Sequence, residues 1–402
     1  MYMIKEHTSA LTLISLCLLC CCSCKPGRQN AEIKVETPSV QVENTGKVQS
    51  WPVSEKTNND FLASETDSIK YIPLETTPEC LIGQINQILR FGDSLIVVDP
   101  YSSNSVCVFD LQGRFCHKIG NQGNGPGEYG RVGYVHLSDD GTIYLSDRSS
   151  GRILSYTRDG KFIKDYRLKN GTPQEFVVLN DSIIAGSYAG YSPNAPYRLK
   201  WLDWEGNELN TALPYTTNRS YVAGTFLTGK QGEVYFYHPM NDTIFEVTEN
   251  SIRPYLSMNF YDEEELASFM KETEGWKDKD YLKKLFRSDK ITNCVQVIRC
   301  DSHWVVYSQK GKYSYLSVID KERRDYLRAD MQKKKLYIPD YPAAAWHDWL
   351  IGYINPEALD YFSEEQRKEL LKALSETHSA EISLDSLKEC NPIITMYHLK
   401  TK

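Results

Sequence analysis

The sequence predicts an all-β fold, a six-bladed β-propeller closed by pairing of its N- and C-terminal strands. A unit of roughly 47 residues, filled with short strand-like runs and polar turns, recurs along the chain. Two runs near the chain ends, 68–75 and 391–400, are strand-like but lack a blade neighbour. The clearest copies of the unit are 93–120 and 141–168, which align Asp99 with Asp147, Phe109 with Tyr156 and Gly113 with Gly160.

The N-terminal segment 1–24 has the pattern of a lipoprotein signal peptide. Its apolar run, 10–22, is too short for a comfortable membrane span. Its end, LLCCCSCK, resembles the bacterial signal in which a small residue precedes a lipidated cysteine, which makes Cys24 the expected lipidation site, with Cys21 and Cys22 as alternatives. An uncleaved N-terminal anchor is the other possibility. We expect a location in the cell envelope, lipid-anchored to the outer membrane and either periplasmic or surface-exposed.

The next segment, 25–60, is polar and lacks a core pattern, so we expect a flexible tether before the propeller domain of 61–402. A flexible chain of roughly 35 residues spans about 30–35 Å. The net charge of −7 disfavours nucleic acid, which requires clustered Lys and Arg. We expect no nucleic-acid partner, and we expect contact with the membrane only through the lipid anchor.

Six blades can be counted from the hairpins between their first and second strands. Each hairpin joins a polar turn to an apolar or aromatic strand. These hairpins are GDSLIVVD (92–99), DDGTIYLSD (139–147), NDSIIAGS (180–187), QGEVYFYH (231–238), CDSHWVVYS (300–308) and HDWLIGY (347–353). Pairing the two end runs would close the ring and remove exposed sheet edges.

Two helical insertions interrupt the strand pattern, near 262–290 and near 356–390. The first begins with Asp262 and Glu265 in a capping-box-like arrangement. The second begins with an S-x-x-Q box and carries Leu370, Leu371 and Leu374 on one side. We expect both insertions to pack against the outside of the propeller, with partner docking as the alternative.

Six cysteines lie outside the signal, an even number that invites disulfides in an exported chain. Cys107 and Cys116 would face each other if DLQG forms the turn between their strands. A bond between directly opposed strand residues is often strained, so the free thiols remain an alternative. The absence of a CxxC pair argues against a zinc knuckle.

With these features, the chain resembles the bacterial six-bladed β-propeller lipoproteins with NHL-like blades. The resemblance is carried by KYIPLET (70–76), the repeated [VL]-x-D … F-x-x-x-G units, GNQGNGPGEYGRV (120–132) and NPIITMYHLK (391–400). It implies a six-bladed ring on an exported, lipid-anchored chain. It implies little about chemistry, because related propellers include both enzymes and binding modules.

The first residues of the innermost strands are expected to line the central channel. Only one of them, Glu175, is anionic, which disfavours the oxygen-rich calcium centre of propeller hydrolases. We therefore expect no metal site and no cofactor. The predicted ring is Gln87, Tyr134, Glu175, Thr225, Val295 and Tyr341.

The glycine-rich loop 120–132 lacks the Lys-Ser/Thr and the following helix of a phosphate-binding motif. We expect its glycines to let the loop turn over the ring and display side chains at the channel mouth. Asp99 and Asp147 are expected to cap turns. The predicted ligand-binding residues are Glu128, Tyr129, Arg131, Tyr134, Arg148, Glu175 and His238.

The function predicted from these features is ligand or partner binding, with a glycan, a peptide or a protein as ligand. Aromatic and Arg side chains suit stacking and bidentate contacts. No GxSxG, HxH or HExxH motif is present, so no catalytic residue is assigned. The alternative is a hydrolase or lyase that uses Glu175, Glu128 or His238 at the channel mouth. A purely structural role of the helical insertions is a third possibility.

Overall fold

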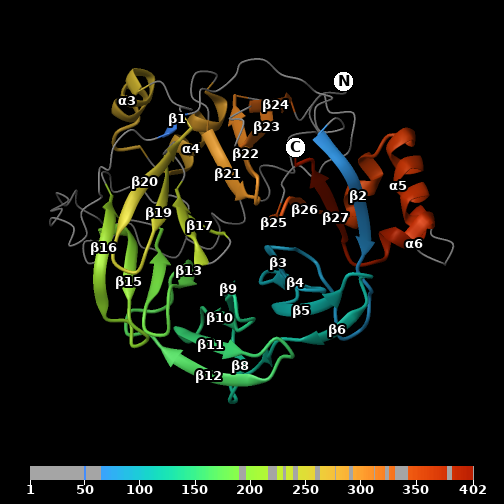
Figure 1. Ribbon diagram of the computed structural model, residues 1–402, viewed down its shortest axis with the longest axis horizontal. Helices are drawn as coiled ribbons and strands as arrows, with labels where there is room; N and C mark the ends of the chain where they lie inside the picture. Colours follow the sequence, from blue (N-terminus) through green and yellow to red (C-terminus); the bar gives the residue numbers. More distant parts are fainter. Residues whose placement is uncertain are drawn as a thin grey trace. The chain divides into compact units, whose positions relative to one another are not determined.

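Six small β-sheets surround a central axis, with the first strand of each nearest the centre (Figure 1). This confirms the predicted six-bladed propeller. All described residues belong to one compact unit, 36–402. The computed structural model describes 49–50, 65–189, 196–215, 224–229, 232–238, 243–258, 263–276, 278–288, 293–311, 313–321, 326–330, 343–377 and 383–401. The predicted signal, Cys24 and nearly all of the tether lie outside these residues.

Blades 1 to 3 follow one another along the chain, and each is a four-stranded antiparallel sheet in sequence order. In blade 1 these are β3 (Gln87–Phe91), β4 (Ser94–Asp99), β5 (Ser105–Asp110) and β6 (Phe115–Lys118). Blade 2 has β9 (Val132–Leu137), β10 (Ile143–Asp147), β11 (Arg152–Tyr156) and β12 (Phe162–Arg167). Blade 3 has β13 (Glu175–Val178), β14 (Ile184–Ser187), β15 (Tyr197–Leu202) and β16 (Glu208–Pro214).

Blades 4 to 6 complete the ring and carry the additions to the pattern. Blade 4 has β17 (Thr225–Thr228), β18 (Val234–Tyr237), β19 (Thr243–Val247) and β20 (Ile252–Ser257), with β1 (Gln49–Ser50) added in parallel at its outer edge. Blade 5 has β21 (Asn293–Arg299), β22 (His303–Lys310), β23 (Tyr313–Asp320) and β24 (Tyr326–Asp330). Blade 6 has β25 (Ala344–Trp346), β26 (Trp349–Ile354), β27 (Ile393–Leu399) and β2 (Thr66–Pro73).

Blade 6 is built from both ends of the described chain. β2 is its outer strand and pairs antiparallel with β27, from Thr66 opposite Leu399 to Pro73 opposite Ile393. Asn391 reinforces the junction, since its side chain accepts from Ile82 N and donates to the carbonyls of Glu75 and Cys80, at 2.8 to 2.9 Å. The predicted closure by the two end runs is therefore confirmed.

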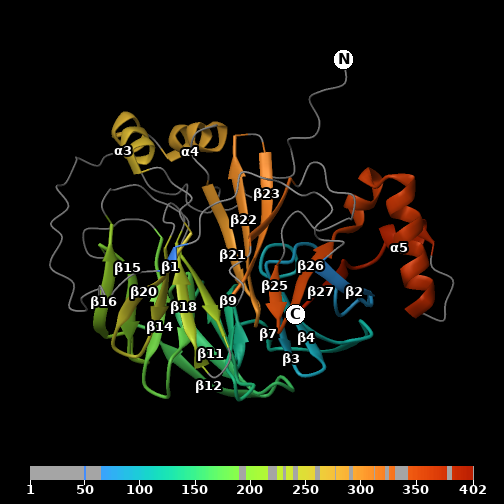
Figure 2. The same cartoon turned by 45° about the horizontal axis from the view of Figure 1, so that its top comes forward.

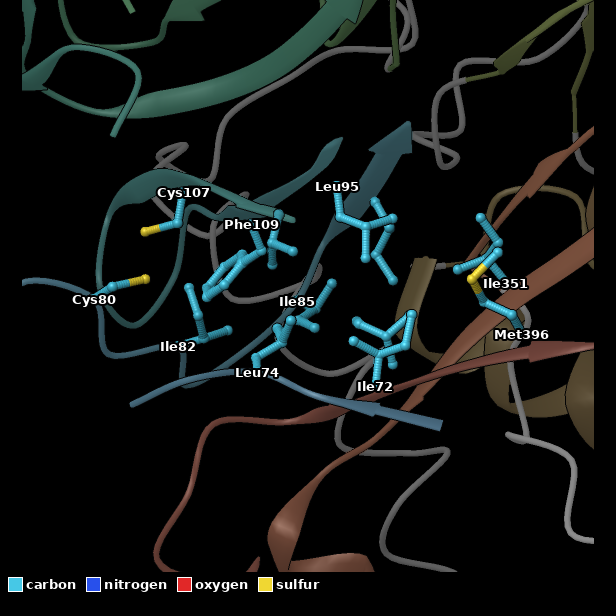
Figure 3. Close-up of a cluster of buried hydrophobic side chains, with 13 residues drawn as sticks. Ile72, Leu74, Cys80, Ile82, Ile85, Leu95, Cys107, Phe109, Ile351 and Met396 are labelled. Atoms are coloured by element: carbon cyan, nitrogen blue, oxygen red, sulfur yellow. The ribbon is translucent and has the colours of Figure 1, made fainter. Parts of the chain in front are cut away.

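The hydrophobic core is divided into layers between neighbouring blades, because each sheet buries both of its faces. The layer between blades 1 and 2 contains Val98 and Tyr156, both completely buried. The layer between blades 6 and 1 (Figure 3) joins β3–β5 to Ile351 and Met396. A strand buried on both faces favours a continuous apolar run such as LIVV at 95–98 rather than alternation.

The repeated glycines lie where one blade touches the preceding one. Gly113 and Gly160 occupy the turn between the third and fourth strands of blades 1 and 2, with φ of 80° and 81°. A Cβ at Gly113 would come within 2.0 Å of the Pro73 carbonyl oxygen, and one at Gly160 within 2.7 Å of the Lys118 oxygen. Glycine is therefore required both for the left-handed backbone and for the close approach.

The helical insertions occur where they were predicted. Blade 6 receives η2 (Pro356–Tyr361), α5 (Glu364–Thr377) and α6 (Leu384–Lys388) between β26 and β27, on the outside of the ring (Figure 1). The predicted S-x-x-Q box forms at the start of α5, because Gln366 N donates to Ser363 Oγ and Ser363 N to Gln366 Oε1. Blade 4 is followed by α3 (Glu263–Glu272) and α4 (Asp278–Arg287), drawn together in Figure 2. Asp262 lies outside the described residues.

The expected pairing of Cys107 with Cys116 is wrong. The turn forms as predicted, but a register shift between Val108 and Phe109 places Cys107 opposite Lys118. Cys107 is completely buried, whereas Cys116 is exposed. The extra residue in β6 turns the Cys116 side chain away from the core, as a β-bulge does.

Candidate functional site

The candidate site lies at the end of the channel where the inter-blade loops meet the loops that follow the second strands. The loop between blades 1 and 2 is held by a short parallel pair, β7 (Asn121–Gln122) and β8 (Glu128–Tyr129). We use the name mouth surface for Arg131, Tyr134, Arg148 and Glu175, which come from this loop and from the adjacent ends of blades 2 and 3.

Two of the predicted binding residues instead fold their own loop. The Glu128 carboxylate accepts a hydrogen bond from Gly125 N at 2.7 Å, and it fills the space that a Cβ at Gly123 would need. Tyr129 is 1% exposed and packs in the layer between blades 1 and 2. Burial raises the pKa of Tyr129, and the Val106 backbone opposes this rise only in part. We therefore leave both residues out of the mouth surface.

Asp99 and Asp147 are completely buried and bind backbone amides, as their equivalent positions in blades 1 and 2 predict. Asp99 accepts from the N–H groups of Tyr101, Ser102 and Ser103 and also from those of Gly83 and Gln84 in the preceding inter-blade loop. Each carboxylate therefore caps one turn and ties one inter-blade loop.

Asp147 repeats this arrangement in blade 2, accepting from Ser149 N and from Gly130 and Arg131 N. Burial alone would raise its pKa, but hydrogen bonds from the hydroxyls of Ser149 and Ser150 and from the backbone outweigh it and hold the pKa well below the ordinary range. The Asp147 carboxylate is thus occupied by donors within the fold, which also include the Arg152 guanidinium at 3.5 Å.

The mouth surface combines exposed cationic side chains with an aromatic ring. Arg131 and Arg148 are exposed, and their backbones are joined by the hydrogen bond from Arg148 N to Arg131 O at 2.9 Å. Tyr134 is half-buried and packs edge-on against Phe176, with centroids 5.8 Å apart. Burial, and then the nearby Glu175, raise the pKa of Tyr134, so its hydroxyl is neutral.

Glu175 bridges two blades. Its carboxyl accepts from Phe226 N at 3.3 Å and from Thr225 Oγ1 at 3.4 Å, both in the first strand of blade 4. Gln87, which also begins the first strand of its blade, makes the equivalent bridge between blades 1 and 2. Its amide accepts from Val135 N at 2.9 Å and donates to Val135 O at 3.1 Å.

In both bridges the hydrogen-bonded backbone belongs to the residue that follows a predicted ring residue. Phe226 follows Thr225, and Val135 follows Tyr134. Burial inside the ring raises the pKa of Glu175 to about 8, and the hydrogen bonds and Arg148 only partly oppose this effect. At neutral pH Glu175 is largely a neutral carboxylic acid, with the shape of the Gln87 amide. The sequence predicted that both residues lie at the channel but did not predict the bridges. The available signal was that Gln87 and Glu175 occupy the same position in their blades.

The remaining predicted site residues are more scattered. His238 follows β18 at the blade position of Asp99 and is 9% exposed, with its ring 6.3 Å from that of Phe236. Thr225 donates its hydroxyl to the Glu175 carboxyl. The side chain of Val295 and the whole of Tyr341 lie outside the described residues.

Two further features were not predicted. A buried His303 bonds to Asp348 at 3.3 Å, and Ser302 N donates to the same carboxylate, which joins the first hairpins of blades 5 and 6 on the opposite face. A cavity of about 430 Å³ lies beside the ring closure. It is lined by Thr76, Leu81, Ile82, Gly83, Ser102, Ser103, Glu389, Cys390 and Asn391.

Within the described part of the chain, no three His, Cys, Asp or Glu side chains are grouped so that they could hold a metal ion. Within the same residues, no helix has both the length and the apolar character needed to cross a bilayer.

Comparison with known proteins identifies the family of this chain. A family model described as a domain of unknown function, DUF4934, matches residues 48–398. The chain belongs to the DUF4934 family. The matched region covers nearly the whole described propeller, from β1 in blade 4 to His398 in β27 of blade 6.

Solved structures with a similar fold come from Bacteroides. One is a Bacteroides fragilis protein provisionally described as exported, with a TM-score of 0.71 and 18% identity over 88% of this DUF4934 chain and 100% of that chain. Another is a member of the DUF4221 family from Bacteroides vulgatus, with a TM-score of 0.52 and 12% identity over 84% and 97% of the two chains. At these identities the likeness establishes the fold alone.

Proposed function

We propose that this DUF4934 protein is an exported, lipid-anchored binding module whose mouth surface captures a glycan, peptide or protein ligand. The signal-like N-terminus, Cys24 and the polar tether support export and anchoring. The resemblance to NHL-like propeller lipoproteins points the same way, and so does the description of the Bacteroides fragilis relative.

The observation that carries the binding function is the use of the acidic groups near the mouth. Asp99 and Asp147 bind backbone amides, Glu128 binds its own loop, and Glu175 bridges two blades in a largely neutral form. Structural use of these groups disfavours acid–base catalysis, which needs convergent groups directed at a substrate.

The charge of the mouth surface suggests the class of ligand. With Glu175 neutral, the charged side chains of the mouth surface are Arg131 and Arg148, and its aromatic ring is that of Tyr134. Guanidinium groups bind carboxylates, sulfates and phosphates in a bidentate manner, and an aromatic ring accepts a sugar or a side chain. An anionic glycan or an acidic peptide segment fits this surface best.

One observation favours the alternative function, a hydrolase or lyase acting at the channel mouth. A carboxyl group whose pKa is about 8 can donate a proton at neutral pH, and perturbed groups of this kind gather at active sites. Burial inside the ring explains the raised pKa, and the carboxyl is occupied by its hydrogen bonds to blade 4, which ranks catalysis second.

Ligand capture by the mouth surface is testable with charge variants. The purified protein should be screened on glycan and acidic-peptide arrays, and the best ligand then titrated against Arg131→Ala/Arg148→Ala. We expect binding to weaken at least tenfold, because one lost desolvated charge contact costs on the order of 1–2 kcal/mol. The control is Arg114→Ala, whose side chain is 73% exposed in an outer turn of blade 1.

The outcome separates the candidates. Undiminished capture by the double variant would remove the mouth surface from consideration and direct attention to the cavity beside Asn391. Turnover of a captured ligand that disappears in Glu175→Gln would establish the enzyme instead. Lipidation is tested independently by labelling with palmitate. The wild type should incorporate the label, and the Cys24→Ala protein should not.

A further inference from the structure

We propose that Cys80 and Cys107 are joined by a disulfide in the exported protein, which would link the loop after β2 covalently to the third strand of blade 1. This inference rests on the proposed export but not on the proposed binding function. It differs from the Cys107–Cys116 pairing considered from the sequence, which the register of β5 and β6 excludes.

The two side chains meet in the layer between blades 6 and 1. Figure 3 shows their sulfur atoms pointing toward each other, with Phe109 and Ile82 beside them. Both residues belong to the same buried cluster of the core. Cys80 is 1% exposed and Cys107 is completely buried, so both sulfurs are enclosed by apolar side chains.

Both backbones are already held in place for this bond. Cys107 lies in the middle strands of blade 1, opposite Val97 in β4 and Lys118 in β6. Cys80 N donates to Thr77 O at 3.0 Å, and its own carbonyl accepts from Asn391 Nδ2 at 2.9 Å. Oxidation would therefore join two ordered segments rather than capture a mobile one.

The environment also makes Cys107 the better nucleophile. The hydrogen bond from Cys80 lowers the pKa of Cys107, although burial opposes it, and Ser105 and Lys118 lower it further. Ser105 Oγ lies 3.6 Å from Cys107 Sγ. The reverse holds for Cys80, whose pKa rises because its thiol donates to Cys107 and because it is buried.

The reaction is an ordinary thiol–disulfide exchange. An oxidant disulfide, such as that of an envelope thiol oxidase or of oxidised glutathione, first forms a mixed disulfide with Cys107, the better nucleophile, during folding and releases one thiol. The Cys80 thiolate then attacks the Cys107 sulfur and expels the second thiol. Two protein thiols are oxidised to one disulfide, one oxidant disulfide is reduced to two thiols, and the protons pass to the released thiolates.

The other described cysteines occupy different surroundings. Cys116 is exposed on β6, Cys300 is buried in the layer between blades 5 and 6, and the Cys390 thiol bonds to Ser386 O. Among the described residues, none of these three belongs to the buried layer between blades 6 and 1 that holds Cys80 and Cys107, which makes the proposed pair specific.

The test uses the full-length protein, expressed with its own signal in an exporting bacterium. Free thiols are blocked with a maleimide in denaturant before the protein is digested without reductant and its peptides are identified by mass. We expect one linked pair that contains Cys80 and Cys107 and separates on reduction. Cys116→Ser should retain the linked pair, whereas Cys107→Ser should lose it.

A stability measurement complements the mapping. Closing a loop of this size should raise the melting temperature by about 5 °C, so reductant should lower the melting temperature of the wild type but not of Cys80→Ser. The proposal is overturned if Cys80 and Cys107 are both recovered as maleimide adducts, or if either is linked to another cysteine. The mass of the protein in the same sample shows separately whether it carries the acyl group of an exported lipoprotein. A missing disulfide that results from failed export would therefore be recognised.

Discussion

The first residue of a blade's first strand can act as a clamp between blades. Gln87 does so with a neutral amide, and Glu175 does so with a carboxyl group that burial keeps largely protonated. An ionised Glu175 would retain its acceptor role but would place a poorly solvated charge inside the ring. The bridge that Glu175 makes from blade 3 should therefore depend on pH, whereas the bridge that Gln87 makes from blade 1 should not.

Replacing Glu175 with Gln should make stability less dependent on pH. The folded pKa, about 8, lies above the ordinary value of 4.5, so the native protein holds a proton that the unfolded chain releases. The free energy of unfolding should then fall as pH rises from about 4.5 to about 8, by at most 1.4 kcal/mol per pH unit, roughly. Glu175→Gln should lack this slope and exceed the wild type in stability at about pH 8.

Urea denaturation across this pH range measures the effect. The matched variant is Gln87→Glu, which should acquire a slope of the same sign. Parallel pH profiles for the wild type and Glu175→Gln would contradict the account.

At the scale of elements, strands and caps could be predicted because local signals determine them. Each predicted hairpin leads into the second strand of its blade, and the Ser363–Gln366 box lies at the start of α5. The pairing of Cys107 could not be predicted, since a β-bulge is set by packing across the sheet. The bridge from Glu175 to Phe226 could not be predicted either, because it depends on how two blades approach each other.

The helical insertion in blade 6 should contribute to stability through α5. Leu374 is completely buried against Leu359 and Ile393. Leu374→Ala should lower the free energy of unfolding by about 3 kcal/mol, the cost of the lost apolar contact and the remaining cavity. Chemical denaturation measures it, with the exposed Lys372→Ala as control. Equal stability of both variants would mean that α5 is not part of the cooperative fold.

At the scale of the whole ring, closure depends on one pair of strands. The first strands contact each other in order from blade 2 to blade 6, and β25 contacts β3 to complete the circle. Gln87 connects β3 to β9. β2 covers the edge of β27, which would otherwise expose unpaired backbone groups.

Removing residues 1–75 should therefore open the ring at blade 6. We expect the truncated protein to associate through the bare edge of β27 and to lose its single cooperative unfolding transition. Size-exclusion chromatography and calorimetry measure these changes. Removal of 1–48, which retains β1 and β2, is the control and should leave a folded monomer. A monomeric 1–75 deletion with an unchanged melting temperature would show that closure by β2 is dispensable.

The pairing of β2 with β27 also constrains how the chain acquires its structure. β2 leaves the ribosome among the first segments of the domain, whereas its partner is among the last. A contact between such distant segments forms late and slowly, since the intervening chain must first lose its conformational freedom. Until synthesis ends, β2 thus remains an unsatisfied strand, the kind of segment that a chaperone must shield from aggregation.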